Sequence, residues 1–369
     1  MLQNYHLRNY NFKLLILVLC ATITGTYMIN SADSSYLNKQ VIGLVICLTG
    51  MITLSFIDYK FIRKFHFILY IINIILLLCV IFFGTEVNGA QRWLGSSSFI
   101  TIQPSEFTKI IMIICAAHFL ADHKDTINTF KTLVEYAILC AIPLFLVVSQ
   151  PDLSTTIDIF VILFMMLFVA GLSYKIIGIA FLCMIPLAGS FLWYIKQPNP
   201  PLLQDYQVTR ILAFLYPDDY TSTTKWQQDN SVMAIGSGQL FGKGVNNSTL
   251  ATVKDTNLIS EQQTDFIFSV VGEELGFVGS VLVVVILGLI VLQCIRTARK
   301  ASDNMGMLIA TGVATLIGFQ SFINIGVATS LLPNTGIPLP FISYGLSSLV
   351  SSCAAIGLVI NVSLQRRKY

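Results

Sequence analysis

The stretch TDFIFSVVGEELGFVGSVLVVVILGLIVLQCIRTARK, residues 264–300, contains the features that decide the fold. It begins with an acid, Asp265, continues as an apolar run and ends on basic residues. The run exceeds the length of about 18 residues at which an apolar helix can cross a bilayer. Two more acids, Glu273 and Glu274, lie inside it. Charges at membrane depth are costly and tend to mark function, so these acids need an explanation.

The whole chain repeats this apolar pattern. It has 369 residues, of which 55% are hydrophobic and 11% charged, whereas a soluble domain carries roughly a quarter charged residues. The net charge of +3 is too small to suggest nucleic acid as a partner. We therefore predict an all-α polytopic membrane protein with ten transmembrane helices, at residues 12–29, 37–57, 66–83, 104–121, 132–149, 152–170, 174–195, 266–295, 304–332 and 340–363.

The basic residues of the short loops predict the orientation, because Lys and Arg concentrate on the cytoplasmic side. With the N-terminus inside, most of them fall in inner segments: Arg8, Lys13, Lys60, Arg63, Lys64, Lys124, Lys131, Lys175, Arg296, Arg299, Lys300, Arg366, Arg367 and Lys368. Both termini should then be cytoplasmic. The segment 196–265, between the seventh and eighth helices, becomes a long extracytoplasmic loop. Its amphipathic middle predicts short helices on the membrane surface, and loops of this length are usually functional.

Two proline motifs, IQPSEFTK (102–109) and SQPDLSTT (149–156), each predict a proline at the first position of a helix. An acid in the first turn suits the helix dipole, which explains Asp152 structurally. Glu106 and Lys109 are spaced i, i+3 and can pair on one helix face. From the residues alone, a buried structural salt bridge is the favoured interpretation of this pair, and a functional site is the alternative.

The loop contains GSGQLFGKG (236–244), which differs from a phosphate-binding P-loop because neither a Ser or Thr after Lys243 nor a preceding strand is present. Two interpretations stay open for it. Its glycines could leave backbone amides free to meet an anion, or the segment could be a flexible loop.

The ionisable groups gather in the predicted outer half, where carboxylates and cations suit acid–base work on an anionic substrate. There is no His/Cys cluster in the sequence of the kind that binds zinc. Asp265 is either a general base or an N-terminal helix acid. The stretch NTGIPLPFISYGLSSL (334–349) predicts a non-helical start to the last span, which is tolerated only beside protein or a water-filled cavity.

The motifs NGAQRWL, QPSEFTK, QPDLSTT, AIGSGQLFGKG, TDFIFSVVGEELGFVG and NTGIPLPFISYGLSSL, in this order, resemble those of the SEDS family (shape, elongation, division and sporulation). The resemblance runs from about residue 39 to the end, and GIPLPF resembles the RodA branch more than the FtsW branch. Three positions depart from the family pattern. Gln263 stands where His is usual, and Gln239 and Leu346 stand where Gly is usual.

This resemblance implies a single ten-helix domain, residues 1–369, that polymerises lipid II into glycan at the outer face of the cytoplasmic membrane. It implies a class B penicillin-binding protein as the transpeptidase partner, with membrane lipids around both. Asp265 matches the family's essential acid, and Trp93 its QRWL tryptophan. Glu106 and Lys109 match an intramembrane pair, and Arg210 a loop arginine.

The mechanism expected is inverting transfer, in which Asp265 takes the proton of a sugar 4-hydroxyl and undecaprenyl diphosphate leaves the donor glycan. Arg210, Lys243 and then Arg92 are the cations expected at the diphosphate; a divalent cation, Mg²⁺ or Mn²⁺, is a candidate to share this task. Trp93 packs on a sugar or anchors at the interface. Asp152, Glu273 and Glu274 are expected to support the site. The alternatives are a flippase for the lipid-linked precursor, a non-enzymatic scaffold, and a division or sporulation paralogue.

Overall fold

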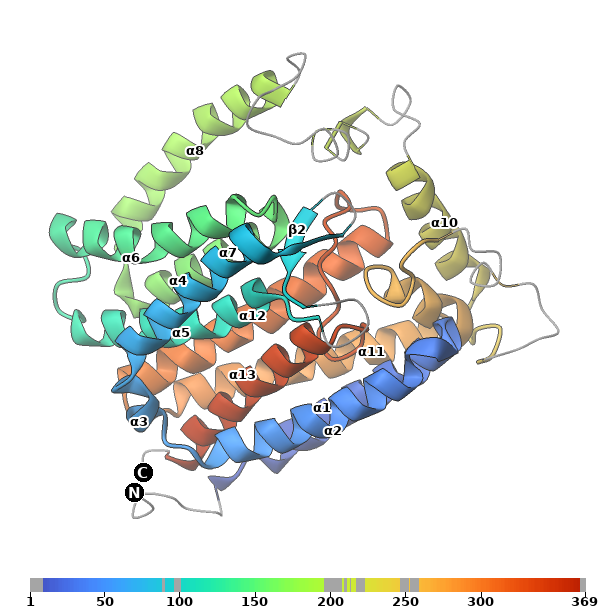
Figure 1. Cartoon of the computed structure of the whole chain (residues 1–369), viewed down its shortest axis with the longest axis horizontal. Helices are drawn as coiled ribbons and strands as arrows, with labels where there is room; N and C mark the ends of the chain where they lie inside the picture. Colours follow the sequence, from blue (N-terminus) through green and yellow to red (C-terminus); the bar gives the residue numbers. More distant parts are fainter. Residues whose placement is uncertain are drawn as a thin grey trace.

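A computed structural model of the protein describes residues 9–87, 90–95, 101–195, 208, 211–212, 214–216, 223–245, 252 and 259–365. In this part of the chain, ten helices are long and apolar enough to cross a membrane (Figure 1). They are α1 (Phe12–Ala32), α2 (Leu37–Phe56), α4 (His66–Phe83), α5 (Pro104–Asp122), α6 (Phe130–Val148), α7 (Leu153–Gly171), α8 (Tyr174–Ile195), α11 (Ile267–Arg299), α12 (Asn304–Ala328) and α13 (Leu346–Leu364). The predicted all-α polytopic membrane fold is confirmed.

Short elements connect these helices. They are the 3₁₀ turn η3 (Ser34–Tyr36), α3 (Tyr59–Arg63), α10 (Thr223–Ser237) and the antiparallel strands β1 (Thr85–Val87) and β2 (Ala90–Trp93). The small ribbon between α4 and α5 was not predicted, since strands of three and four residues are too short to show an alternating pattern. It leaves the fold class unchanged.

The interior of the bundle is formed by α5, α12 and α13, in which 72%, 61% and 78% of the apolar window is buried. Small residues let these helices approach their neighbours closely, as is usual between helices in membranes. Gly357 of α13 shows this, because a Cβ there would lie 2.7 Å from the carbonyl oxygen of Met51 in α2. These three helices therefore determine how the outer helices are placed.

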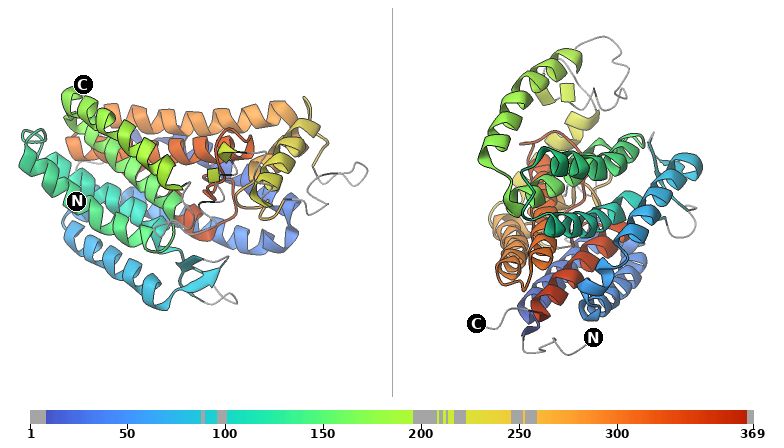
Figure 2. Two further views of the ribbon diagram at one scale, coloured as in Figure 1. Left: turned by 90° about the horizontal axis from the view of Figure 1, so that it is seen from above. Right: turned by 90° about the vertical axis from the view of Figure 1, so that its left-hand side faces the viewer.

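The peripheral helices carry the lipid-facing surface. Only 17% of the α4 window is buried, and large side chains such as Phe82, Phe83, Phe130 and Phe145 are more than two-thirds exposed. Such a surface is stable only against hydrocarbon. Helix α8 is the extreme case: none of the described residues in its window is buried, and it leans away from the bundle in Figure 1 and in the right-hand view of Figure 2.

Two predictions of where a helix begins are wrong. The last helix begins at Leu346 rather than at 340, because the preceding segment contains the positive-φ residues Gly336, Phe341 and Gly345, which no helix accommodates. The second proline motif also differs from the prediction. α7 begins at Leu153 and Asp152 is its N-cap, so Pro151 precedes the helix, whereas Pro104 does stand at the start of α5.

Much of the predicted extracytoplasmic loop lies outside the described residues, but α10 belongs to it. This helix packs on α11 and α12. Ser231 Oγ donates a hydrogen bond to the carbonyl oxygen of Ala328 (2.7 Å), and Gln228 Nε2 donates to those of Val327 and Leu332 (3.1 and 2.8 Å). α10 therefore caps the end of α12 by polar contacts with protein, a role that its sequence did not predict.

The two ends of the described chain lie at the same end of the bundle, where Ser363 Oγ donates a hydrogen bond to the carbonyl oxygen of Asn9 (3.2 Å). Asp265 lies at the opposite end, just before α11. The 33 residues of α11 cover about 50 Å at the rise of an α-helix. The bundle thus has two distinct ends, one at which the described chain begins and finishes and the other at which α11 begins, after Asp265 (Figure 1 shows α11 running along the bundle).

Candidate active site

Asp265 lies in the turn that leads into α11, and its side chain is half-buried. Three successive carbonyl oxygens of this turn accept hydrogen bonds from elsewhere in the fold. The bonds run from Tyr344 N to Gln263 O (2.8 Å), from Ser343 Oγ to Thr264 O (2.6 Å) and from Asn324 Nδ2 to Asp265 O (2.8 Å). Phe266, only 1% exposed, fixes the turn from the other side by packing with Val327. The backbone that carries the Asp265 carboxylate is therefore rigidly held.

The non-helical segment 334–345 links this turn to the rest of the outer end. Asn324 Nδ2 donates a second hydrogen bond to the carbonyl oxygen of Ile337 (2.8 Å), and Ser154 Oγ donates one to that of Thr335 (2.5 Å). The segment is thus held by α12 and α7 while it holds the Asp265 turn. This explains the positive-φ residues of the segment, because only an irregular backbone can offer carbonyls in several directions.

An aromatic pair lies next to the turn. The rings of Tyr36 and Tyr344 are 4.5 Å apart between centroids. Burial, and then the nearby Tyr36, raise the pKa of the Tyr344 phenol above its ordinary value. Tyr344 therefore remains a neutral phenol across the physiological pH range.

Helix α11 is broken at Gly276, where φ is 67° and ψ is −164°. A continuous helix would bond Phe277 N to Glu273 O and Val278 N to Glu274 O. The loop 239–244 takes over both bonds: Phe277 N and Val278 N donate to the carbonyls of the loop, and two loop amides donate to the carbonyls of α11. The four bonds run from Phe277 N to Gln239 O (2.8 Å), Val278 N to Leu240 O (3.1 Å), Lys243 N to Glu273 O (2.9 Å) and Gly244 N to Glu274 O (3.1 Å).

This exchange requires glycine, because the two backbones nearly touch. A Cβ on Gly242 would lie 2.0 Å from the carbonyl oxygen of Glu274, and one on Gly276 would lie 2.3 Å from the amide nitrogen of Gly242. Both glycines also have positive φ. Gln239 has a φ of 50° in the same loop, a left-handed conformation that disfavours a side chain. This is a position where the family usually has glycine.

The side chains strengthen the same contact. Lys243 Nζ lies 2.7 Å from Glu273 Oε1, with Glu273 only 1% exposed. Glu274 accepts a hydrogen bond from Ser31 Oγ at the end of α1. The expectation that the glycine-flanked amides are free to meet an anion is wrong for Lys243 and Gly244, since both amides are bonded to α11. Lys243 reaches a phosphate only by exchanging Glu273 for it.

Arg92 and Asp152 form a second contact of the outer end. Arg92 Nη1 lies 3.5 Å from Asp152 Oδ1, and its Nη2 donates to the carbonyl oxygen of Pro151. Asp152 is 2% exposed and, as N-cap of α7, accepts a hydrogen bond from the Thr155 amide. Asp152 thus has a structural role at the start of α7, but as its N-cap and not as the first-turn acid that was predicted. Arg92 and the neighbouring Trp93, which is partly buried at the end of β2, are positioned by this cap.

The intramembrane pair Glu106–Lys109 is confirmed, with Lys109 Nζ 2.8 Å from Glu106 Oε1. A third member, Asp158 of α7, lies 3.6 Å from Lys109 Nζ and accepts a hydrogen bond from Gln320 Nε2 (2.7 Å). All three charged side chains are at most 5% exposed. The cluster joins α5, α7 and α12 in the centre of the bundle.

Sequence reasoning missed Asp158 and Asn324. Asp158 stands in the apolar run IDIFVILF and Asn324 in SFINIGVA, so each is a polar residue inside a predicted span. That was a usable signal, because polar residues inside a membrane span mark contacts or sites. Asn324 is the more informative of the two, since it holds both the Asp265 turn and residue Ile337.

Two expectations fall outside this geometry. Arg210 lies outside the described residues. The divalent cation, Mg²⁺ or Mn²⁺, stays a prediction: within the described ranges no group of three or more His, Cys, Asp or Glu side chains is placed to hold a metal ion.

The arrangement presents one rigidly held carboxylate at the bundle end, with cation–carboxylate pairs below and beside it. Such a carboxylate can accept a proton from a hydroxyl group brought to it, which is general-base chemistry. Lys243 and Arg92 each have a carboxylate partner, so both are positioned cations rather than mobile ones.

The comparisons with known proteins agree with this architecture. A family model described as "Cell cycle protein" (FtsW, RodA, SpoVE) matches residues 5–368. A probable peptidoglycan glycosyltransferase FtsW of Geobacter metallireducens is 33% identical over 98% of this chain and 96% of its own. The peptidoglycan glycosyltransferase MrdB of Escherichia coli is 32% identical over 96% of this chain and 93% of its own.

The solved structures include a chain of a peptidoglycan synthase complex that coordinates polymerization and crosslinking. It is 27% identical, with a TM-score of 0.79 over 96% of this chain and 97% of that one. The likeness therefore covers almost the whole of both chains.

Proposed function

The chain belongs to the SEDS family, which includes FtsW, RodA and SpoVE, and we propose that it is a peptidoglycan glycosyltransferase that polymerises lipid II with Asp265 as general base. The observation that carries this proposal is the position of Asp265. Its turn is fixed by three hydrogen bonds to backbone carbonyls, so the backbone that carries the carboxylate is held in place at the bundle end. Lipid II has a sugar in water and a tail in lipid, and a base at the membrane surface suits it.

The reaction is a single displacement with inversion. The 4-hydroxyl oxygen of the acceptor sugar forms a bond to the anomeric carbon of the donor, and the bond from that carbon to the diphosphate breaks. Asp265 takes the hydroxyl proton, and undecaprenyl diphosphate leaves with the electron pair. General-base catalysis of this kind contributes about 10²–10⁴-fold to the rate.

Positive charge would stabilise the departing diphosphate. Lys243 and Arg92 are candidates for this role, and each would exchange its carboxylate, Glu273 or Asp152, for a phosphate oxygen. Arg210 is the third candidate by its match to the family motif. Trp93, next to Arg92 in β2, is placed to pack on a sugar or at the interface.

The supporting residues would act through the helices. The Glu106–Lys109–Asp158 cluster fixes α5, α7 and α12 together, and α12 carries Asn324 to the Asp265 turn. A substitution in the cluster would therefore shift Asp265 through α12, although the cluster itself would not touch the substrate.

The protein would act in the cytoplasmic membrane with both termini in the cytoplasm, which puts Asp265 on the outer face. A class B penicillin-binding protein would crosslink the glycan; the likeness to a chain of a peptidoglycan synthase complex supports this partner. The GIPLPF motif supports a role in cell shape and elongation rather than in division or sporulation.

The test is glycan polymerisation from purified lipid II by the purified chain, alone and with its class B transpeptidase, with products separated by length. The proposal predicts long glycan strands in at least the combined reaction. A flippase would instead move lipid II across a liposome membrane without forming polymer. A scaffold would do neither, and either of these results would overturn the proposal.

A further inference from the structure

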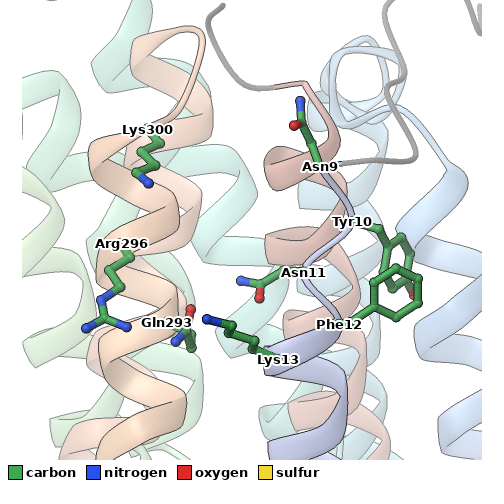
Figure 3. Close-up of a pocket in the computed structure, with 8 residues that line it drawn as sticks. All are labelled: Asn9, Tyr10, Asn11, Phe12, Lys13, Gln293, Arg296 and Lys300. Carbon is green, nitrogen blue, oxygen red and sulfur yellow. The ribbon is translucent and has the colours of Figure 1, made fainter. Parts of the chain in front are cut away.

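A pocket of about 510 Å³ opens at the bundle end opposite Asp265, between the start of α1 and the last turns of α11 (Figure 3). Its lining includes Tyr10, Asn11, Lys13, Gln293, Arg296 and Lys300. The proposed polymerisation makes no use of this pocket, which lies about 50 Å from the turn of Asp265 along α11.

The charge of the pocket is entirely positive. Lys13, Arg296 and Lys300 line it, and no Asp or Glu does. Among the described residues, none of the three belongs to an ion pair. Three like charges facing one space repel each other, so an anion between them would be stabilised.

The floor of the pocket is built from buried polar groups. Asn11, 7% exposed, caps α1 by accepting from the Leu14 amide (3.2 Å), and its Nδ2 donates to Thr297 Oγ1 of α11 (3.5 Å). Gln293 is 9% exposed, and its side-chain amide has no hydrogen-bond partner among the described residues. Figure 3 shows Gln293 and Lys13 pointing into the space between the two helices. The two helix ends are thus tied together, and a donor remains for a ligand.

The start of α1 adds to this potential, because the first turn of a helix carries unpaired amides and the positive end of the dipole. Arg296 also suits the C-terminal end of α11, where cations complement the dipole. Lys13 stands at the end of α1 where the helix dipole disfavours a cation. The excess of Lys and Arg on the cytoplasmic side accounts for a basic residue there, and an anion in the pocket would offset the unfavourable dipole.

The surface below the pocket decides which anion fits. Phe12 and Ile16 of α1 are 60% and 57% exposed, and Leu292 and Ile295 of α11 are 46% and 43% exposed. Phe12 and Ile16 share one face of α1, and Leu292 lies one turn before Arg296 on the same face of α11. On α11, exposed apolar surface therefore continues from Arg296 through Leu292 toward the bilayer centre. A free phosphate would leave this surface unused, whereas acyl chains would cover it.

We propose that this pocket is a binding site for an acidic glycerophospholipid, whose phosphate lies among Lys13, Arg296 and Lys300 while its acyl chains run along α1 and α11. Basic pockets between transmembrane helices on the cytoplasmic side are suited to such headgroups. The site would place the polymerase in contact with the acidic lipids of the inner leaflet, on the face opposite the reaction.

The test compares the full chain with the variant Lys13→Gln/Arg296→Gln/Lys300→Gln. Both are reconstituted in nanodiscs of phosphatidylcholine with a minor fraction of phosphatidylglycerol, and the lipids retained after extraction are counted by native mass spectrometry. The matched control is Lys124→Gln/Lys131→Gln/Lys175→Gln, which removes the same charge from exposed residues away from the pocket. Only the pocket variant removes three cations that line one space, so retained phosphatidylglycerol should fall at least about tenfold in the pocket variant and much less in the control. Equal retention in the full chain and the pocket variant, or equal loss in both variants, would overturn the proposal.

Two further measurements distinguish a phospholipid from free phosphate and test the site in the unmodified chain. Inorganic phosphate added to the chain in phosphatidylcholine alone should leave its thermal unfolding midpoint unchanged; a rise that depends on Lys13, Arg296 and Lys300 would assign the pocket to free phosphate instead. A photoactivatable phosphatidylglycerol should crosslink the unmodified chain at residues 9–16 or 292–300, which needs no variant to fold. Crosslinks confined to other segments would contradict the lipid site.

Discussion

Lys243 and Glu273 contact each other twice: the Lys243 amide donates to the Glu273 carbonyl at 2.9 Å, and the Lys243 ammonium lies 2.7 Å from the Glu273 carboxylate. One backbone bond and one ion pair thus join the loop 239–244 to α11 where that helix is broken at Gly276. The double contact fixes Lys243, the loop residue that was expected at the diphosphate.

Replacing Lys243 by Met should lower the free energy of unfolding by about 3–5 kcal/mol, because the buried Glu273 carboxylate loses the cation that lies 2.7 Å from it. The double change Lys243→Met/Glu273→Gln should recover a large part of this loss. SDS titration in mixed micelles would measure both. A cost for the single variant no larger than for the double variant would show that the ion pair adds nothing to the backbone exchange.

Two changes in the same loop should act in opposite directions. Gly242→Ala should destabilise the protein by more than about 2 kcal/mol, because its φ is 79° and a Cβ would lie 2.0 Å from the carbonyl oxygen of Glu274. Gln239→Gly should stabilise it by about 1 kcal/mol, since φ is 50° there. Thermal unfolding in detergent would measure the two shifts, with Gly50→Ala, which meets no atom within 4 Å, as the control. Shifts of the same sign would refute the account of the loop.

The buried cluster of α5 and α7 predicts an order of stabilities. Lys109→Met leaves the carboxylates of Glu106 and Asp158 without their cation and should cost about 3–5 kcal/mol. Asp158→Asn leaves a neutral Glu106–Lys109 pair and should cost less, about 1–2 kcal/mol. The midpoint of thermal unfolding would rank the two variants. The reverse order would mean that Asp158, not Lys109, is the residue on which the cluster depends.

Asn324 should affect the reaction through the Asp265 turn. Asn324→Leu removes the donor to the carbonyls of Asp265 and Ile337, so kcat should fall about 10–100-fold with a smaller change in KM. Asn361→Leu is the matched control, because Asn361 bridges Tyr59 and Ser55 at the opposite end of the bundle. The rate of lipid II polymerisation per folded molecule would be measured for both variants. Equal losses of kcat in the two variants would mean that Asn324 only stabilises the fold.

The sequence predicts those features that depend on local spacing. Apolar runs located all ten helices, and the i, i+3 spacing located the Glu106–Lys109 pair. Each of these follows from the length or the period of one helix. The same rules missed the short strands β1 and β2.

The features that depend on distant backbone contacts were not predictable in this way. The bonds between the loop 239–244 and α11 form because Gly276 frees two amides and two carbonyls, and no local pattern shows which segment will bind them. The hydrogen bonds that fix Asp265 likewise come from Asn324 and from residues 343–344. Asp158 was predictable in principle, since a lone acid in an apolar helix must meet a partner.

The most direct test of the central claim is lipid II polymerisation by Asp265→Asn, with its class B transpeptidase present. The variant keeps the shape of the side chain and removes the base. Glu261→Gln is the matched control, because Glu261 is an exposed acid of the same turn. The account predicts a loss of at least about 10²-fold for Asp265→Asn, with the unfolding midpoint unchanged, and near-normal polymer for Glu261→Gln. Undiminished polymer from a folded Asp265→Asn protein would contradict the assignment of Asp265 as the general base.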